Sequence, residues 1–234
     1  IGALAQNMYW FLILRSDLKA KKGDINAIKG LKIGAAPLVN LGLKRLLAES
    51  GIDEKRDGVE IGPVPGAFLG ENKNFGVAAA KALEAGLIDG FWANGMGAEV
   101  AVKSGAGTMV IDARRGDGPP GAINYTMPAL ITSDAVIKRD PDAVAAAVRA
   151  LVKTQEALKA DVSLATKVGK KYFPDEEASL IAGVVERDLP FYTASISREF
   201  VDGMTDFQRT MGLIKGNPSY EDVVATQFAD LWGA

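Results

Sequence analysis

The sequence predicts an α/β protein with two lobes, and three observations lead to this fold class. Short apolar runs alternate with helical segments between residues 31 and 112, only helical segments follow Pro141, and loop-like stretches at 15–24 and 112–121 flank the first region. Strand–helix alternation is typical of a mainly parallel sheet with crossover helices. The 234 residues suffice for one large domain or two small lobes.

The central stretch is expected to contain four strands separated by helices. One helix places Val39, Leu43, Leu46 and Leu47 on a single face, and the Ala-rich segment Phe75–Leu87 forms another. Open parallel sheets bind ligands beyond the carboxyl ends of their strands. The expected strands are Leu31–Ala35, Val59–Val64, Asp89–Trp92 and Thr108–Ile111.

The C-terminal region is expected to consist of helices. Asp140 and Pro141 supply a cap and a first-turn proline for a long helix with an apolar stripe through Val144 and Val148. Further helices are expected near Pro174, near Ser195 and at Ser219, where Ser-Tyr-Glu-Asp resembles a capping box.

Two further strands, Tyr9–Leu14 and Ala122–Thr132, are too few to cover these helices. The chain also begins with Ile1 and carries no recognisable leader, so we expect lobe one to be incomplete at the N-terminus. The expected division is 1–27 with 119–234 for lobe one and 28–118 for lobe two. The polar residues Gln6, Asn7 and Tyr9 interrupt the apolar start, which requires them to be hydrogen-bonded or to face a cavity.

The Gly/Pro-rich stretch Asp112–Gly121 has two readings. It is either a surface loop with solvated charges or one of two hinge crossings, the other being Arg15–Asp24. Two crossings would produce a clamshell.

Composition excludes several function classes. The chain has no cysteine and no histidine, which removes thiolate nucleophiles, imidazole bases and the usual zinc ligands. The net charge of -2 and the absence of long basic tracts argue against nucleic acid as a partner. No dinucleotide fingerprint or phosphate-binding loop motif occurs.

The order of elements resembles a known family. Ile28–Gly34, the helix to Gly51-Ile52-Asp53, Val59–Val64 and Ala79–Ala93 look like the second lobe of periplasmic substrate-binding proteins of ABC importers, in the nitrate/sulfonate/bicarbonate (taurine-type) branch. The C-terminal features that fit the same branch are Arg115–Pro119, Tyr125-Thr126, Phe173–Glu177, Arg187-Asp188 and Pro190–Tyr192.

The resemblance implies a type II periplasmic-binding fold, a two-lobed clamshell. It implies an exported, periplasmic or extracytoplasmic receptor that captures a small organic or oxyanionic solute between its lobes. The receptor delivers the solute to an ABC importer permease. It further implies a monomer without cofactor, metal or catalytic residues, and leaves the solute unspecified.

Candidate ligand-binding residues follow the expected strands. Asn40 ends the turn Ala36–Asn40, where free backbone amides would meet an anion, or else it caps the helix. Phe68 follows the next strand and either stacks on a ligand or packs as a lid residue. Many relatives carry Ser or Thr in the first of these turns, and the departure here puts oxyanion specificity in doubt.

Four more candidates lie further along the chain. Trp92 is either a ligand wall or a core residue, and Asn94 offers an amide or ordinary turn chemistry. Arg114 would pair with an anion unless Asp112 and Asp117 neutralise it. Tyr125 offers a hydroxyl or packs as a strand aromatic.

Two other function classes stay open. One is an enzyme on the same fold that uses carboxylates, Lys or Tyr, since relatives with cysteine or histidine chemistry are excluded by composition. The other is a ligand-sensing effector domain of a regulator, which no helix-turn-helix or basic face in this chain supports.

Overall fold

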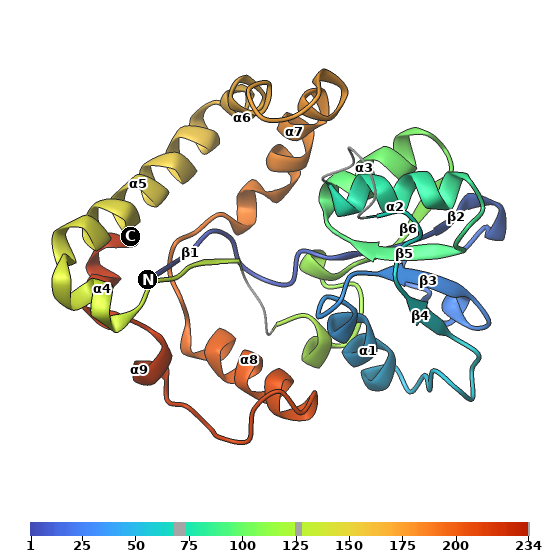
Figure 1. The fold of residues 1–234 in the computed structure, drawn as a ribbon, viewed down its shortest axis with the longest axis horizontal. Coiled ribbons are helices and arrows are strands. Elements are labelled where there is room, and N and C mark those ends of the chain that lie inside the picture. The colour runs from blue at the N-terminus through green and yellow to red at the C-terminus, as the bar shows by residue number, and fades with distance from the viewer. Residues whose placement is uncertain (68–73, 125–127, 234) are drawn as a thin grey trace. The chain divides into compact units, whose positions relative to one another are not determined.

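The computed structural model describes residues 1–67, 74–124 and 128–233, which form two compact units (Figure 1). Unit 1 consists of Ile1–Asn7 and Asn124–Ala234, and unit 2 of Met8–Ile123. The discontinuous order expected from the sequence is present, but the chain passes between the units at residues 7/8 and 123/124. Residues 8–27 and 119–123, expected in lobe one, thus belong to unit 2. Neither Arg15–Asp24 nor Asp112–Gly121 is a crossing.

Unit 2 is built on a five-stranded mixed sheet in the order β4-β3-β5-β2-β6. The central strands β3, β4 and β5 are parallel, whereas β2 is antiparallel to both of its neighbours, β5 and β6. The four expected central strands are thereby confirmed. The bounds are β2 Phe11–Arg15, β3 Lys32–Ala35, β4 Glu60–Gly62, β5 Gly90–Ala93 and β6 Gly107–Asp112.

The residues 8–27 join unit 2 because β2 lies inside this sheet. Its side chains Phe11 to Leu14 are all buried, since the strand has a neighbour on each edge and helices cover the sheet. A continuous apolar run of this kind is typical of a strand buried on both faces. The same pattern would fit a buried strand of either lobe. The sequence therefore did not predict that unit 2 begins at Met8 instead of at residue 28.

Helices cover both faces of this sheet, with α1 on the side opposite α2 and α3 (Figure 1). Helix α1 (Asn40–Glu49) buries Leu43, Leu46 and Leu47, as the sequence predicts. Helices α2 (Phe75–Glu84) and α3 (Gly95–Lys103) present alanines to Phe91 and Ala93 of β5. The small side chains let these two helices approach closely: a Cβ placed on Gly97 would lie 2.5 Å from the Gly76 carbonyl oxygen.

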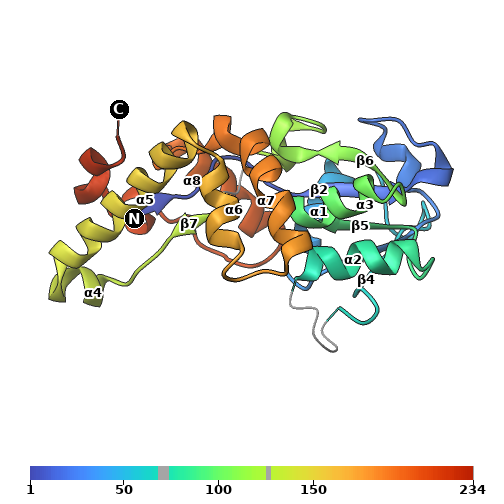
Figure 2. The ribbon, with the colours of Figure 1, turned by 90° about the horizontal axis from the view of Figure 1, so that it is seen from above.

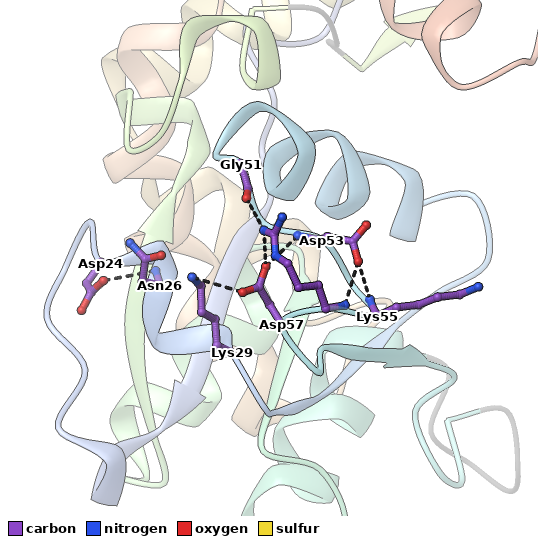
Figure 3. Close-up of polar contacts among 8 residues, drawn as sticks. Asp24, Asn26, Lys29, Gly51, Asp53, Lys55 and Asp57 are labelled. Atoms are coloured by element: carbon purple, nitrogen blue, oxygen red, sulfur yellow. Dashed lines mark hydrogen bonds and ion pairs between the residues drawn. The ribbon is translucent and has the colours of Figure 1, made fainter.

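An ion-pair network lies at the amino end of the parallel strands β3 and β4 (Figure 3). The Asp57 carboxylate accepts from the Asp53 N–H at 2.9 Å and from Arg56 Nη2 at 2.7 Å, and Lys29 Nζ lies 3.3 Å away. Arg56 also donates to the Gly51 carbonyl. The Asp53 N–H, and after it Arg56, lower the pKa of Asp57 to about 2. These bonds tie the segments that precede β3 and β4 together.

Unit 1 combines a short antiparallel pair of strands with most of the helices (Figures 1 and 2). Strand β1 (Gly2–Ala3) pairs with β7 (Ala129–Leu130). The Gln155 side chain, only 5% exposed, donates to the carbonyls of Ala3 and Leu4. The helices are α4 Asp134–Arg139, α5 Pro141–Ala160, α6 Ser163–Gly169, α7 Asp175–Asp188, α8 Arg198–Thr210 and α9 Tyr220–Val223.

The helix caps expected from the sequence are confirmed. The Asp140 side chain accepts from the Ala143 N–H at the start of α5, and Ser219 forms a capping box with Asp222 at α9. The expected strand Ala122–Thr132 is wrong over its described part, because Pro120–Ala122 form a 3₁₀ turn and only Ala129–Leu130 are extended in a ladder. No helix in the described ranges is long and apolar enough to cross a membrane.

Candidate functional site

The described candidate residues of unit 2 lie at or near one edge of its sheet. Strands β3, β5 and β6 run in the same direction and end at this edge, whereas antiparallel β2 begins at it. Phe11, the first residue of β2, pairs with Ala93 and with Asp112, the last residues of β5 and β6. We name this the carboxyl edge; the segments that flank its strands are 8–10, 36–40, 94–97 and 113–115.

Arg114 and two aromatic residues meet at this edge. The Arg114 guanidinium carbon lies 5.4 Å from the centroid of the Tyr9 ring, and the Tyr9 and Trp10 rings stack with centroids 4.7 Å apart. Arg114 is 4% exposed, and both rings are half-buried. Burial raises the pKa of the Tyr9 phenol, and the Arg114 charge opposes that shift. The phenol therefore keeps its proton at neutral pH.

The acids near Arg114 have partners of their own. The Asp112 carboxylate accepts from Arg115 Nη1 at 2.8 Å and from the Arg115 backbone N–H. Asp117 accepts from the Asp112 N–H and lies 3.6 Å from Lys22 Nζ. The described contacts of these two carboxylates include Arg115, Lys22 and the loop backbone.

Trp92 lies inside the sheet. It pairs with Leu12 on one side and Ala35 on the other, and its side chain is 0% exposed. Trp92 is therefore a core residue, and its indole ring has no exposed face that could line a ligand site. Its Nε1–H, however, is buried without a hydrogen-bond partner. A buried donor in a folded protein is normally satisfied, so this atom needs an explanation.

Asn94 follows β5 and is the N-cap residue of α3. Its side chain makes no capping hydrogen bond, and its Oδ1 is buried without a partner. Oδ1 lies 2.7 Å from the position that a Cβ on Gly76 would occupy, so it sits against the start of α2. Asn94 is therefore a half-buried polar group at the carboxyl edge.

Asn40 is the first residue of α1, and Val39 precedes it as the cap residue. No side chain caps this helix, so the interpretation of Asn40 as a capping residue is wrong. The amides of Asn40, Leu41 and Gly42 donate to carbonyls of the turn, which restricts the free amides expected there. Leu38 has a φ of 67° and is 75% exposed, so the turn is held in a conformation that non-glycine residues seldom adopt.

Phe68 and Tyr125 lie outside the described residues. Sequence reasoning missed Trp10, and it treated Tyr9 only as a polar interruption of an apolar segment. The available signal was an aromatic pair directly before a buried strand. Gln6 meets its own expectation, because its Nε2 donates to the carbonyls of Thr193 and Ser195 within unit 1.

The carboxyl edge combines aromatic, cationic and amide side chains. Across the described ranges, no group of three or more Asp, Glu, His or Cys side chains could hold a metal ion. The edge offers aromatic hydrogen-bond donors, the guanidinium groups of Arg114 and Arg115, and the amide of Asn94. A separate apolar groove of about 250 Å³ lies within unit 1, against α8.

Comparison with known proteins identifies the fold. No family model and no curated protein matches the chain. Among solved structures, the chain is similar to a putative periplasmic sulfonate-binding protein, SsuA, of Methylobacillus flagellatus, with a TM-score of 0.61 and 18% identity. That match covers 98% of this chain and 64% of the other, so the chain spans less than two thirds of this neighbour.

Two further solved structures have a similar fold. The ligand-binding component of an ABC-type import system from Staphylococcus aureus, solved with zinc bound, matches with a TM-score of 0.68 and 13% identity, over 99% of this chain and 74% of that one. SsuA of Xanthomonas axonopodis pv. citri, bound to MOPS, matches with a TM-score of 0.60 and 16% identity, over 97% and 72%. The chain has the type II periplasmic-binding fold of the substrate-binding proteins of ABC importers.

Proposed function

We propose that this chain is the solute-binding part of an exported receptor of an ABC importer. Its solute is a small organic or oxyanionic molecule bound at the carboxyl edge of unit 2, captured between two lobes and passed to a membrane permease. The receptor acts as a monomer outside the cytoplasm. The fold neighbours that bind solutes for ABC import support this reading.

The observation that carries the proposal is the set of groups at the carboxyl edge. Tyr9, Trp92 and Arg114 supply hydrogen-bond donors there, beside the amide of Asn94. Such a set suits reversible capture of a solute, because buried polar contacts fix its orientation. Asn40, Phe68 and Tyr125 remain proposed solute contacts.

A binding screen tests the proposal. The purified chain is titrated calorimetrically with taurine, methanesulfonate, nitrate, bicarbonate, pyrimidines and aromatic acids. We expect saturable binding of one class with a Kd in the micromolar range or below, and unchanged solute when the mixture is re-examined by mass spectrometry. Chemical conversion of a bound compound would contradict a receptor and favour an enzyme.

The enzyme alternative has one observation in its favour. The desulfurization enzyme DszB, solved as a Cys-to-Ser variant with biphenyl-2-sulfinic acid, shares the fold with a TM-score of 0.55 and 15% identity, over 97% of this chain and 74% of that one. This chain has no cysteine, so a thiolate mechanism has no nucleophile here. The product analysis in the screen separates the two functions.

A further inference from the structure

The turn between α6 and α7 in unit 1 exposes a group of apolar side chains (Figure 1). Tyr172 is 76% exposed, Val168 is 52% exposed and Phe173 is 42% exposed. Single exposed apolar residues are common on protein surfaces, but a group of them marks a contact with another protein or with a membrane. We name the exposed residues 167, 168 and 170–173 the α6–α7 corner.

The α6–α7 corner is held in place from its inner side. The amides of Tyr172 and Phe173 both donate to the Gly169 carbonyl, each at 2.9 Å. Gly169 itself is buried and faces α7, because a Cβ in its place would collide with the Ile181 side chain. The turn is therefore anchored on α7, and its exposed side chains start from a fixed backbone.

Three exposed lysines lie among these apolar residues. Lys170 has helical dihedral angles, so the helical spacing of α6 continues into the turn. Lys167 and Lys171 are four positions apart, and so are Val168 and Tyr172, which places each pair on one face and the two pairs side by side. Cationic and apolar groups are thus mixed over one small surface.

The lysines of the corner are available to an external anion. Neither Lys170 nor Lys171 has an ion-pair partner in the part of the chain that the structure describes, whereas Lys167 has Asp161 as an electrostatic neighbour. Three carboxylates follow at positions 175–177, in the first turn of α7. The positive end of the helix dipole offsets part of their charge.

This combination of groups matches the interfacial layer of a membrane. A lysine can lay its methylene stem along apolar groups while its ammonium stays at the level of the lipid phosphates. A tyrosine suits the same layer, because its ring is apolar and its hydroxyl remains hydrated. A headgroup layer adapts to an exposed corner, whereas a protein partner must supply a complementary pocket for each aromatic ring.

We propose that the α6–α7 corner is a peripheral contact site for membranes that contain anionic phospholipids. Val168, Tyr172 and Phe173 enter the boundary between headgroups and acyl chains. Lys170 and Lys171 meet the lipid phosphates. The contact is reversible, because the buried apolar area is small and the remaining attraction is electrostatic. It goes beyond the proposed receptor function and requires no solute.

Vesicle sedimentation of the purified full chain, without solute, tests the proposal. One set of vesicles contains phosphatidylcholine alone, and the other contains equal parts of phosphatidylcholine and phosphatidylglycerol. We expect about tenfold stronger partitioning into the anionic vesicles at low salt, and a loss of this preference as salt screens the lysines. Equal partitioning into the two kinds of vesicle, or no binding to either, overturns the proposal.

Charge variants locate the contact. Lys170→Gln combined with Lys171→Gln should weaken binding to the anionic vesicles about tenfold, because each lysine near a charged membrane surface contributes to the attraction. Lys19→Gln combined with Lys21→Gln removes the same charge from an exposed loop of unit 2 and is the matched control. Equal losses in the two double variants would show that net charge, and not the corner, drives binding, which overturns the assignment.

Two further variants give effects of opposite sign. Tyr172→Ala should weaken binding to the anionic vesicles about threefold, whereas Leu87→Ala, at a residue that is 51% exposed in unit 2, should leave it unchanged. Glu176→Gln removes a negative charge beside the corner and should strengthen binding about twofold. Circular dichroism verifies that each variant is folded. Unchanged binding in both Tyr172→Ala and Glu176→Gln contradicts the proposal.

Failure of this proposal is distinguishable from failure of the receptor function. The vesicle experiment contains no solute, and the corner belongs to unit 1, whereas the carboxyl edge belongs to unit 2. Absence of vesicle binding therefore refutes the membrane contact and leaves the receptor function to the solute screen.

Discussion

The Arg114 guanidinium lies over the ring of Tyr9, with its central carbon 5.4 Å from the ring centroid. The two residues are more than a hundred positions apart in sequence and lie just outside β6 and β2, which pair directly. A cation over an aromatic face is attracted by the ring quadrupole, and the attraction is strongest where water is excluded. This contact links the segment that precedes β2 to the segment that follows β6.

Replacing Arg114 with Ala should weaken binding of an anionic solute by more than about 1 kcal/mol, because a desolvated charge-assisted contact is worth that or more. Arg114→Lys keeps the charge and should recover part of the loss. Titration of both variants with the solute found in the screen measures the effect. An affinity unchanged in Arg114→Ala would return Arg114 to a purely structural role beside Tyr9.

Truncation of Trp92 separates its packing from its N–H. Trp92→Ala removes a fully buried ring and should cost about 3–5 kcal/mol of unfolding free energy. Trp92→Phe fills most of the same space and also removes a buried donor without a partner, so its loss should be far smaller. Urea unfolding monitored by circular dichroism gives both values. Equal losses would mean that the indole N–H has a partner in the folded protein.

The contact between α2 and α3 tolerates no added methyl group at Gly97. A Cβ there would lie 2.5 Å from the Gly76 carbonyl oxygen, so Gly97→Ala must push the helices apart and should cost about 1–3 kcal/mol. Gly62→Ala in β4 is the control, since nothing lies within 4 Å of its added Cβ. Thermal unfolding of the two variants compares them directly. A Tm for Gly97→Ala equal to that of the control would contradict this packing.

The Asp57 network predicts acid sensitivity. The folded-state pKa of about 2 lies below the usual value of 3.8, so folding favours the ionised carboxylate. The resulting stability is present above about pH 4 and is lost as the pH falls toward 2. Asp57→Asn should lower the urea midpoint at pH 7, and its deficit against wild type should shrink between pH 4 and pH 2.

A pH-independent difference between Asp57→Asn and wild type would show that the carboxylate charge contributes nothing. This variant also serves as a binding control, because Asp57 lies at the amino end of the parallel strands and the candidate site lies at their carboxyl end. Its solute affinity should match wild type wherever the protein is folded.

Local features were predicted well from the sequence because they depend on neighbours along the chain. The caps at Asp140 and Ser219 need only a side-chain oxygen two or three residues before the amide that it accepts from. The Ala-rich face of α2 follows from helical periodicity. The same reasoning placed Asn94 and Arg114 after strands that end at one edge.

The candidate site was predicted only in part. The sequence allowed Trp92 to be either a wall of the ligand site or a core residue. Its ring is fully buried, so it is a core residue, although its Nε1–H has no hydrogen-bond partner. The sequence allowed Asn40 to be either part of an anion site or the cap of α1. Val39 is the cap residue and no side chain caps the helix, so Asn40 does not have the capping role. Such outcomes depend on which strands and turns become neighbours, and a single sequence does not encode those distances.

The sequence by itself determined the α/β class, the positions of the central strands, the capped starts of α5 and α9 and the lack of histidine and cysteine chemistry, since composition and local periodicity suffice for these. Only the tertiary structure decided that β2 enters the sheet between β5 and β6. That pairing moved the boundary of unit 2 to Met8 and brought Tyr9 against Arg114. The physical reason is that strand pairing is non-local: an apolar run satisfies any buried sheet position, and the contacts made across the fold select one.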